Sequence, residues 1–152
     1  MQYTAVIRTL GTAGEKYQKL LDSLVSQTLP PEEILVYIAE GYKIPSETVG
    51  TEKYIFVKKG MVAQRALRYD EVKTEYILFL DDDLYFPPDA VEKMFSLLGR
   101  YGADVISPDV FHNSERPFGQ RFLMAVSGRM RARYEDSLWG YKVMRTAGYS
   151  YN

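Results

Sequence analysis

The feature that most constrains the fold is an apolar segment that ends in three consecutive carboxylates. Residues 76–80 are all apolar or aromatic, which predicts a strand buried on both faces, as in the interior of a parallel sheet. Asp81, Asp82 and Asp83 follow directly. Open α/β sheets bind their ligands at the carboxyl ends of the strands, and unpaired carboxylates are costly to bury. The segment therefore predicts a parallel α/β sheet with a ligand at this strand end.

The spacing of the carboxylates indicates which ligand. Asp81 and Asp83 are two residues apart, so in extended backbone they point to the same side with their Cα atoms about 6–7 Å apart. Both can then approach one hard metal ion, directly or through its waters. Mg²⁺ or Mn²⁺ fits such an all-oxygen site, and zinc does not. The alternative interpretation is a solvated acidic turn after a core strand.

Composition excludes several classes of protein. The chain has 152 residues, enough for one domain with a real core. Its 19 Lys and Arg residues against 20 Asp and Glu residues give a net charge of −1, so we expect no nucleic-acid partner held by bulk charge. Cysteine is absent, which excludes disulfides and thiolate metal sites and is compatible with the cytosol. No segment resembles a signal peptide or has the apolar length needed to span a bilayer.

Hydrophobic periodicity predicts strands that alternate with helices. Strands are expected at residues 3–8, 34–38, 54–57, 76–80 and 105–106, and helices at 15–27, 62–69 and from Pro88 to just before Gly102. Asp136 is suited to cap a last helix that carries Leu138, Tyr141 and Met144. This order predicts an α/β fold with a doubly wound, mostly parallel sheet and helices on both faces.

Five segments, in order, resemble those of nucleotide-sugar glycosyltransferases of family 2, which have the GT-A fold. Residues 6–9 resemble the first strand and turn of that family, and residues 21–28 its L-x-S-L-x-x-Q helix end. Residues 31–36 resemble the P-x-E-I-I-V strand that follows, and residues 63–65 a turn and helix with a basic residue. Residues 81–83 stand at the D-x-D position. A lone D-x-D is weak, but the ordered set, which runs from about residue 3 to residue 108, is specific.

The chain also departs from the family pattern. The family usually has an acidic D-D-G-S after its second strand, and here only Glu40 remains as a substitute. Arg8 replaces a common proline, and Ala66 stands where asparagine is usual. These departures affect the contacts to the base more than the metal site.

The resemblance implies transfer of a sugar from a nucleoside diphosphate, preferably UDP, to a hydroxyl of a sugar or glycan acceptor, with inversion. It implies nucleotide contacts from Thr9, Glu40, Arg65, Asp81 and Asp82, and Mg²⁺ or Mn²⁺ held by Asp81 and Asp83. Asp81 would share the ion or accept hydrogen bonds from the ribose. The setting implied is polysaccharide assembly in the cytoplasm, with peripheral association at the inner face of the membrane.

The acceptor base is the least defined group. The family places an acidic pair at a helix start, and Glu135-Asp136 resembles it, which makes Asp136 the candidate catalytic base. A plain helix cap is the alternative. Only 16 residues follow Asp136, so we expect either a compressed enzyme or the nucleotide-binding half of a longer one. In this interpretation residues 1–152 form one domain, with the nucleotide-binding part in about 1–110 and an incomplete acceptor part in 111–152.

Other functions remain alternatives. A non-catalytic nucleotide-sugar-binding module would share all the features above except the base. A sugar-phosphate nucleotidyltransferase would explain the glycines of residues 10–14, but the second glycine spacing and the following arginine are missing. A haloacid-dehalogenase phosphatase needs Thr or Val two places after D-x-D, where Tyr85 stands. Product analysis separates these classes.

Overall fold

The computed structural model describes residues 1–108 and 141–144. The chain divides into two compact units, Met1–Glu92 and Lys93–Asn152, which we describe separately. The assignment of one domain, with its nucleotide-binding part in residues 1–110, stays a prediction.

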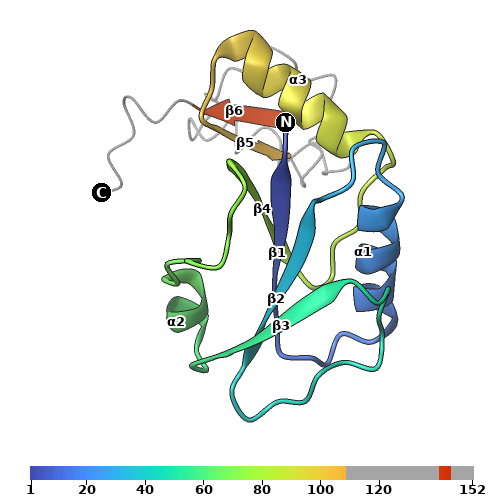
Figure 1. The fold of residues 1–152 in the computed structure, drawn as a ribbon, viewed down its shortest axis with the longest axis vertical. Helices are drawn as coiled ribbons and strands as arrows, with labels where there is room; N and C mark the ends of the chain where they lie inside the picture. The colour runs from blue at the N-terminus through green and yellow to red at the C-terminus, as the bar shows by residue number, and fades with distance from the viewer. Residues whose placement is uncertain (109–140, 145–152) are drawn as a thin grey trace, which may run out of the picture. The chain divides into compact units, whose positions relative to one another are not determined.

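A four-stranded parallel sheet forms the centre of the first unit (Figure 1). Its strands are β1 (Tyr3–Thr9), β2 (Glu33–Ala39), β3 (Glu52–Val57) and β4 (Tyr76–Asp81), in the order β3-β2-β1-β4. All three strand pairs are parallel, so every strand ends at the same edge of the sheet. The expected doubly wound, mostly parallel α/β fold is confirmed.

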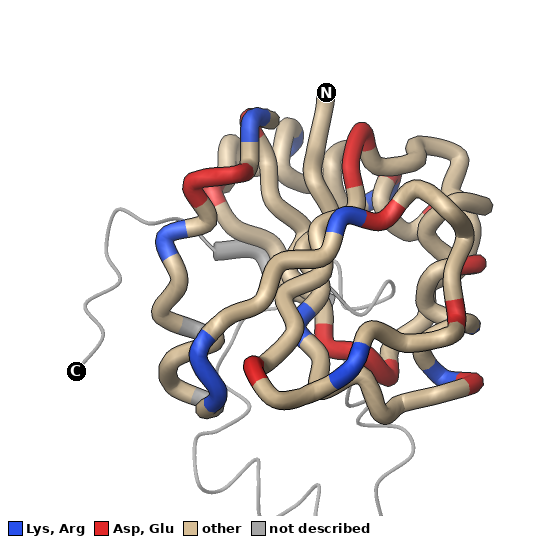
Figure 2. The backbone as a smooth tube through the Cα atoms, turned by 60° about the horizontal axis from the view of Figure 1, so that its bottom comes forward, with Lys and Arg blue, Asp and Glu red and all other residues tan. Residues whose placement is uncertain are grey.

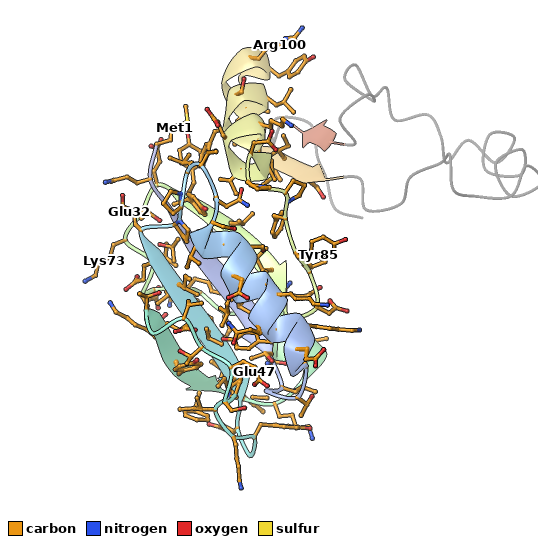
Figure 3. All side chains as sticks on the ribbon, turned by 90° about the vertical axis from the view of Figure 1, so that its right-hand side faces the viewer. Met1, Glu32, Glu47, Lys73, Tyr85 and Arg100 are labelled. Carbon is orange, nitrogen blue, oxygen red and sulfur yellow. The ribbon has the colours of Figure 1, made fainter. Side chains whose placement is uncertain are left out.

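Helix α1 (Glu15–Val25) covers one face of this sheet, as Figure 3 shows from the side of the helix. Its apolar residues recur at helical spacing, and Tyr17, Leu20, Leu21 and Leu24 are at most 1% exposed. They pack against the strand residues that point to the same side, which are Ala5, Ile7, Ile34, Val36, Ile38 and Leu80. We call this side of the sheet the α1 face.

The opposite face is covered by shorter pieces of chain. Helix α2 (Met61–Arg65) lies on this side in Figure 1, and it has five residues instead of the eight expected. The chain leaves the helix after Arg65, and Tyr69 adopts a positive φ of 54°. Three apolar residues of this irregular segment nevertheless pack on the core of the sheet face: Leu67, Tyr69 and Val72 contact Val6, Leu35 and Tyr37. The apolar pattern that predicted a longer helix therefore arises from burial of a non-helical segment.

Strand β4 is not buried on both faces, contrary to the sequence prediction. It is one of the two edge strands of the four-stranded sheet, and only its Leu80, on the α1 face, is fully buried. On the opposite face Ile77 is 36% and Phe79 49% exposed. A continuous apolar run cannot distinguish a central strand from an edge strand whose second face is only partly covered, and this accounts for the error.

A buried amide fixes the chain that follows Asp81, Asp82 and Asp83, which we call the acidic turn. Gln27, which closes the L-x-S-L-x-x-Q segment, is 5% exposed. Its Nε2 donates to the carbonyl of Pro87 at 2.7 Å, and its Oε1 accepts from the Val91 N–H at 3.1 Å. The motif therefore joins the end of α1 to the chain that follows the three carboxylates.

The second unit contains most of α3 (Ala90–Tyr101) and two short strands. β5 (Val105–Pro108) pairs antiparallel with β6 (Tyr141–Met144). The expected last helix is wrong at Tyr141 and Met144, because both lie in β6, where the strand-forming Val143 pairs with Ile106. Within the residues described, no helix combines the length and the apolar character needed to cross a membrane.

Candidate functional site

A cavity of about 740 Å³ lies at the carboxyl ends of β1 and β4. Three segments line it: residues 8–10, 12, 13 and 16 from β1 to the start of α1, residues 59, 60 and 64 around the start of α2, and residues 81–83. Figure 2 turns this end of the sheet toward the viewer and shows acidic and basic positions close together there. The three carboxylates thus lie where parallel sheets bind ligands, as predicted from sequence.

Apolar anchors hold the acidic turn on both sides. Leu80 precedes it and is 1% exposed, and Leu84 and Phe86 after it pack against the core of the α1 face. Tyr85, between these two, is 75% exposed and projects away from the sheet (Figure 3). The packed residues on both sides fix the backbone of the acidic turn, and its carboxylates remain at the surface of the cavity.

Asp82 is held by the end of β1. The Thr9 hydroxyl donates to Asp82 Oδ2 at 2.5 Å, and the Gly11 N–H donates to Thr9 Oγ1 at 2.7 Å. Gly11 has a φ of 72°, and a Cβ at this position would collide with the backbone carbonyl of Lys43. Glycine is therefore required for the turn that brings its own N–H to Thr9 and keeps Thr9 directed at Asp82.

Asp81 and Asp83 have different surroundings. Arg8 Nη2 donates to Asp81 Oδ1 at 2.9 Å, across the register in which Arg8 and Asp81 are Cα partners. Asp83 is exposed and has no hydrogen-bond or ion-pair partner within the described part of the chain. The turn thus presents one paired, one hydrogen-bonded and one unengaged carboxylate.

Two lysines add positive charge to the cavity. Lys16 lies in the first turn of α1, and the Lys59 ammonium lies 4.9 Å from the centre of the Tyr42 ring, a cation–π distance. Neither has a carboxylate within ion-pair distance among the residues described. Together with Arg8 they place three cations beside three carboxylates, a balance suited to an anionic ligand that carries its own metal ion.

A tyrosine lies beneath the site. Tyr17 is 1% exposed, and burial raises the pKa of its hydroxyl above the ordinary value, with smaller contributions from Tyr54, Glu52 and Asp82. The phenol therefore stays neutral and adds no charge under the acidic turn.

The sequence profile described as "Glycosyl transferase family 2" matches residues 53–150. This chain belongs to glycosyltransferase family 2. The match covers more than half of the chain and includes the acidic turn. No curated protein matches the sequence.

Solved structures show the fold that this family 2 chain adopts. The crystal structure of S. aureus TarS matches with a TM-score of 0.50 and 18% identity over 69% of this chain and 21% of that one. The structure of S. aureus TarS 1–349 in complex with UDP-GlcNAc matches with a TM-score of 0.51 and 16% identity, over 70% of this chain and 33% of that one. The chain therefore spans a fifth to a third of the length of these proteins, and the likeness shows a GT-A fold.

The structure brings together four of the predicted site residues of this family 2 chain. Thr9, Asp81, Asp82 and Asp83 line one cavity. Glu40 follows β2 at the same edge of the sheet, and its N–H donates to the Val57 carbonyl at 2.8 Å, but it is not among the residues that line the cavity. Its role in binding the nucleoside stays a prediction.

Two further predicted residues cannot be placed in the cavity. Arg65 is the last residue of α2, but its side chain is not among those that the structure describes, so its predicted phosphate contact is not tested. Asp136 lies outside the described residues altogether. Both roles stay predictions.

Sequence reasoning passed over Arg8, Lys16, Lys59 and Gln64 as site residues, although all four line the cavity. Arg8 had a usable signal, because it is the one charged residue of a strand that is otherwise buried. Gln64 had none, since only the fold shows that α2 directs this residue, whose Nε2 lies 3.5 Å from the Thr9 carbonyl, toward β1.

Proposed function

We propose that this chain is the nucleotide-binding part of a metal-dependent inverting glycosyltransferase. It binds a nucleoside-diphosphate sugar, preferably a UDP-sugar, for transfer of the sugar to an acceptor hydroxyl. The observation that carries the proposal is the set of three carboxylates at the end of β4, which share a cavity with Thr9 and the lysines in a chain of glycosyltransferase family 2. The TarS structure with UDP-GlcNAc supports the choice of UDP.

The donor set suits Mg²⁺ or Mn²⁺ that binds together with the nucleotide. Within the residues described, no group of three or more His, Cys, Asp or Glu side chains is arranged to hold a metal ion. Mg²⁺ in nucleotide sites characteristically takes one or two carboxylates and completes its shell with phosphate oxygens and water. Asp83, which is unengaged, and Asp81 would supply those carboxylates. When bound, the ion supplies Lewis-acid neutralisation of the leaving diphosphate.

The side chains of this family 2 member have separate parts in donor binding. Thr9 orients Asp82, whose Oδ2 accepts a hydrogen bond from the Thr9 hydroxyl, and both side chains would contact the nucleotide from the wall of the cavity. Lys16 and Lys59 offer cations to the diphosphate. Glu40 and Arg65 would contact the nucleoside and a phosphate, as the family resemblance implies. Asp136 is the candidate base for the acceptor hydroxyl, and the setting in cytoplasmic polysaccharide synthesis at a membrane follows from the resemblance alone.

Calorimetry tests the proposal directly. UDP and GDP are titrated into the chain in Mn²⁺, in Mg²⁺ and in chelator. We expect binding only with metal, tighter for UDP, and a loss of at least about tenfold in affinity for Asp83→Ala, since one metal ligand is removed. Asp70→Ala, which removes an exposed carboxylate outside the cavity, is the matched control and should change nothing. Equal affinity in chelator and in Mn²⁺ would contradict the proposal.

The acceptor base separates a transferase from a binding module. Asp136→Asn should leave the affinity for UDP unchanged in either case, because a base acts on the acceptor and not on the nucleotide. Transfer of sugar from UDP-GlcNAc to a sugar acceptor, lost in Asp136→Asn, would assign the base. Nucleotide binding without any transfer would support the non-catalytic module instead.

A further inference from the structure

Arg8 is an unusual cation for its position in the sheet. It is the last residue but one of β1, in the middle of the sheet, and its side chain is only 18% exposed. Its partner Asp81 lies on the edge strand β4, with a side chain that is 55% exposed. A largely buried arginine side chain is thus paired with a carboxylate whose side chain remains mostly in water. Such a pair compensates the buried cation poorly, since solvent screens its exposed member.

The guanidinium also has unused hydrogen-bonding capacity. Arginine carries five N–H donors in a planar fork, and the bond from Nη2 to Asp81 is the one side-chain bond that Arg8 makes among the described residues. Its Nε is buried and has no hydrogen-bond partner in the part of the chain that the structure describes. Buried donors in native proteins are nearly always satisfied, so this one calls for a partner outside the described residues, either a water or a bound ligand.

The chemistry of the cavity identifies that partner. Arg8 lines the cavity together with Lys16 and Lys59, which have no carboxylate within reach in the described part of the chain. A phosphate group offers several oxygens to one guanidinium and can accept two parallel N–H bonds, whereas Asp81 accepts one here. Three cations on the wall of one cavity match the charge of a diphosphate.

We propose that Arg8 binds a phosphate group of the nucleotide, and that this contact replaces its ion pair with Asp81. Asp81 then holds Arg8 in place only while the cavity contains no nucleotide. Its release makes Asp81 available to the metal ion or the ribose. The inference rests on the proposed function and adds an ordering to it: the second acidic ligand becomes available only when the nucleotide arrives.

The alternative is that the Arg8–Asp81 pair simply fastens β4 to β1. In that case loss of either partner would lower stability by a similar amount, and phosphate affinity would not respond specifically to either. The six register pairs between the two strands already join them through the backbone. Binding measurements in the absence of metal distinguish the two roles.

The test uses inorganic pyrophosphate as the probe and the full chain in chelator at low salt. If Asp81 competes with phosphate for Arg8, Asp81→Asn should tighten pyrophosphate binding by about three- to tenfold, because an amide holds the guanidinium less strongly than a carboxylate does. This gain requires Arg8, so the double variant Arg8→Ala/Asp81→Asn should bind pyrophosphate no more tightly than Arg8→Ala alone. The inference would be overturned if Asp81→Asn did not tighten pyrophosphate binding, or if it tightened binding as much in the Arg8→Ala background as in the unmodified chain.

A second measurement uses UDP in Mn²⁺. Arg8→Ala should weaken binding by about tenfold, and Arg8→Lys should recover part of the loss, since lysine keeps the charge but not the fork. Arg68→Ala removes a cation that is 88% exposed and outside the cavity, so it is the charge-matched control and should stay within about twofold of the unmodified chain. Thermal unfolding of each variant verifies that it is folded.

The outcomes separate this inference from the proposed function. If the unmodified chain binds UDP in Mn²⁺ and both Arg8 variants bind it equally well, the inference fails and the proposed function stands. If the unmodified chain does not bind UDP in Mn²⁺ at all, the proposed function itself fails.

Discussion

The two faces of the four-stranded sheet are covered to different extents. On the α1 face, Ile7, Val36 and Leu80 are at most 1% exposed beneath an eleven-residue helix. On the opposite face, Val6 and Leu35 are equally buried at the centre, but Ile77 and Phe79 on the edge strand are a third to a half exposed. The α1 face is therefore well covered over β1, β2 and β4 and open only at Phe56 of the other edge strand, β3, which is 51% exposed, whereas the opposite face is closed only in the middle.

The difference follows from what covers each face. Helix α1 repeats leucines and Tyr17 at helical spacing over its whole length, which gives it a continuous apolar stripe. Helix α2 has five residues, and Leu67, Tyr69 and Val72 after it pack on the centre of the sheet. Tyr69 also reaches the edge strand, because its ring lies 5.3 Å from that of Tyr37 and 5.0 Å from that of Phe79. A single aromatic contact cannot exclude water from an edge strand. Stability should therefore reside mainly on the α1 face.

The largest expected effect tests this comparison with one truncation on each face. Leu20→Ala, beneath α1, should lower the free energy of unfolding by about 3 kcal/mol, because it opens a cavity in close-packed surroundings. Phe79→Ala should cost only about 1 kcal/mol despite the larger side chain, since half of it already lies in water. Urea denaturation followed by circular dichroism measures both.

Val25→Ala serves as the control on the same helix, because Val25 is 47% exposed, and it should cost about 0.5 kcal/mol or less. A loss for Phe79→Ala as large as that for Leu20→Ala would mean that the two faces contribute equally and would break the comparison.

A smaller effect concerns the polar end of the α1 face. Gln27→Ala should cost about 2 kcal/mol, because the Val91 N–H would lose its buried acceptor and the Pro87 carbonyl would lose one of its two donors. Gln18→Ala is the matched control: Gln18 bonds Asp22 at 2.9 Å and accepts from the Thr48 N–H at 3.2 Å, but these bonds are exposed to solvent, so their loss should cost about 0.5 kcal/mol or less. Similar losses for the two glutamines in the same denaturation experiment would show that the buried amide anchors nothing.

The strands and the first helix were predictable because each carries a complete local pattern. The period of α1 and the apolar runs of β1, β2 and β4 depend only on neighbouring residues. The short α2 and the edge position of β4 depend on tertiary contacts. Tyr69 packs on the sheet from a turn with positive φ, whereas its apolar spacing in the sequence predicted that the helix continues to this residue.

The sequence predicted the acidic residues of the candidate site but not its basic residues. Three carboxylates after an apolar run are conspicuous in sequence, and topology alone places them at a ligand-binding edge. Lys16 and Lys59 are ordinary surface residues until the fold brings the starts of α1 and α2 to one cavity. The pairing of Arg8 with Asp81 depends on the register between β1 and β4, which the sequence does not specify.

The smallest expected effect sharpens the comparison at the margin of the α1 face, where Glu52 begins β3. Burial raises the pKa of Glu52, but the N–H of Val49 at 2.7 Å, the Thr48 hydroxyl at 2.9 Å and further hydrogen bonds outweigh it and hold the pKa below its ordinary value of 4.5. A lowered pKa stabilises the folded state at pH values above the ordinary pKa, and this contribution is lost as the pH falls below about 4.5.

Glu52→Gln should cost about 1 kcal/mol at pH 7 and remove part of the loss of stability on acidification, as measured by urea denaturation between pH 7 and pH 3. Glu75→Gln, at an exposed site with no hydrogen bond among the described residues, should leave the pH profile unchanged. Identical profiles for the two variants would mean that the margin of the α1 face depends on packing alone.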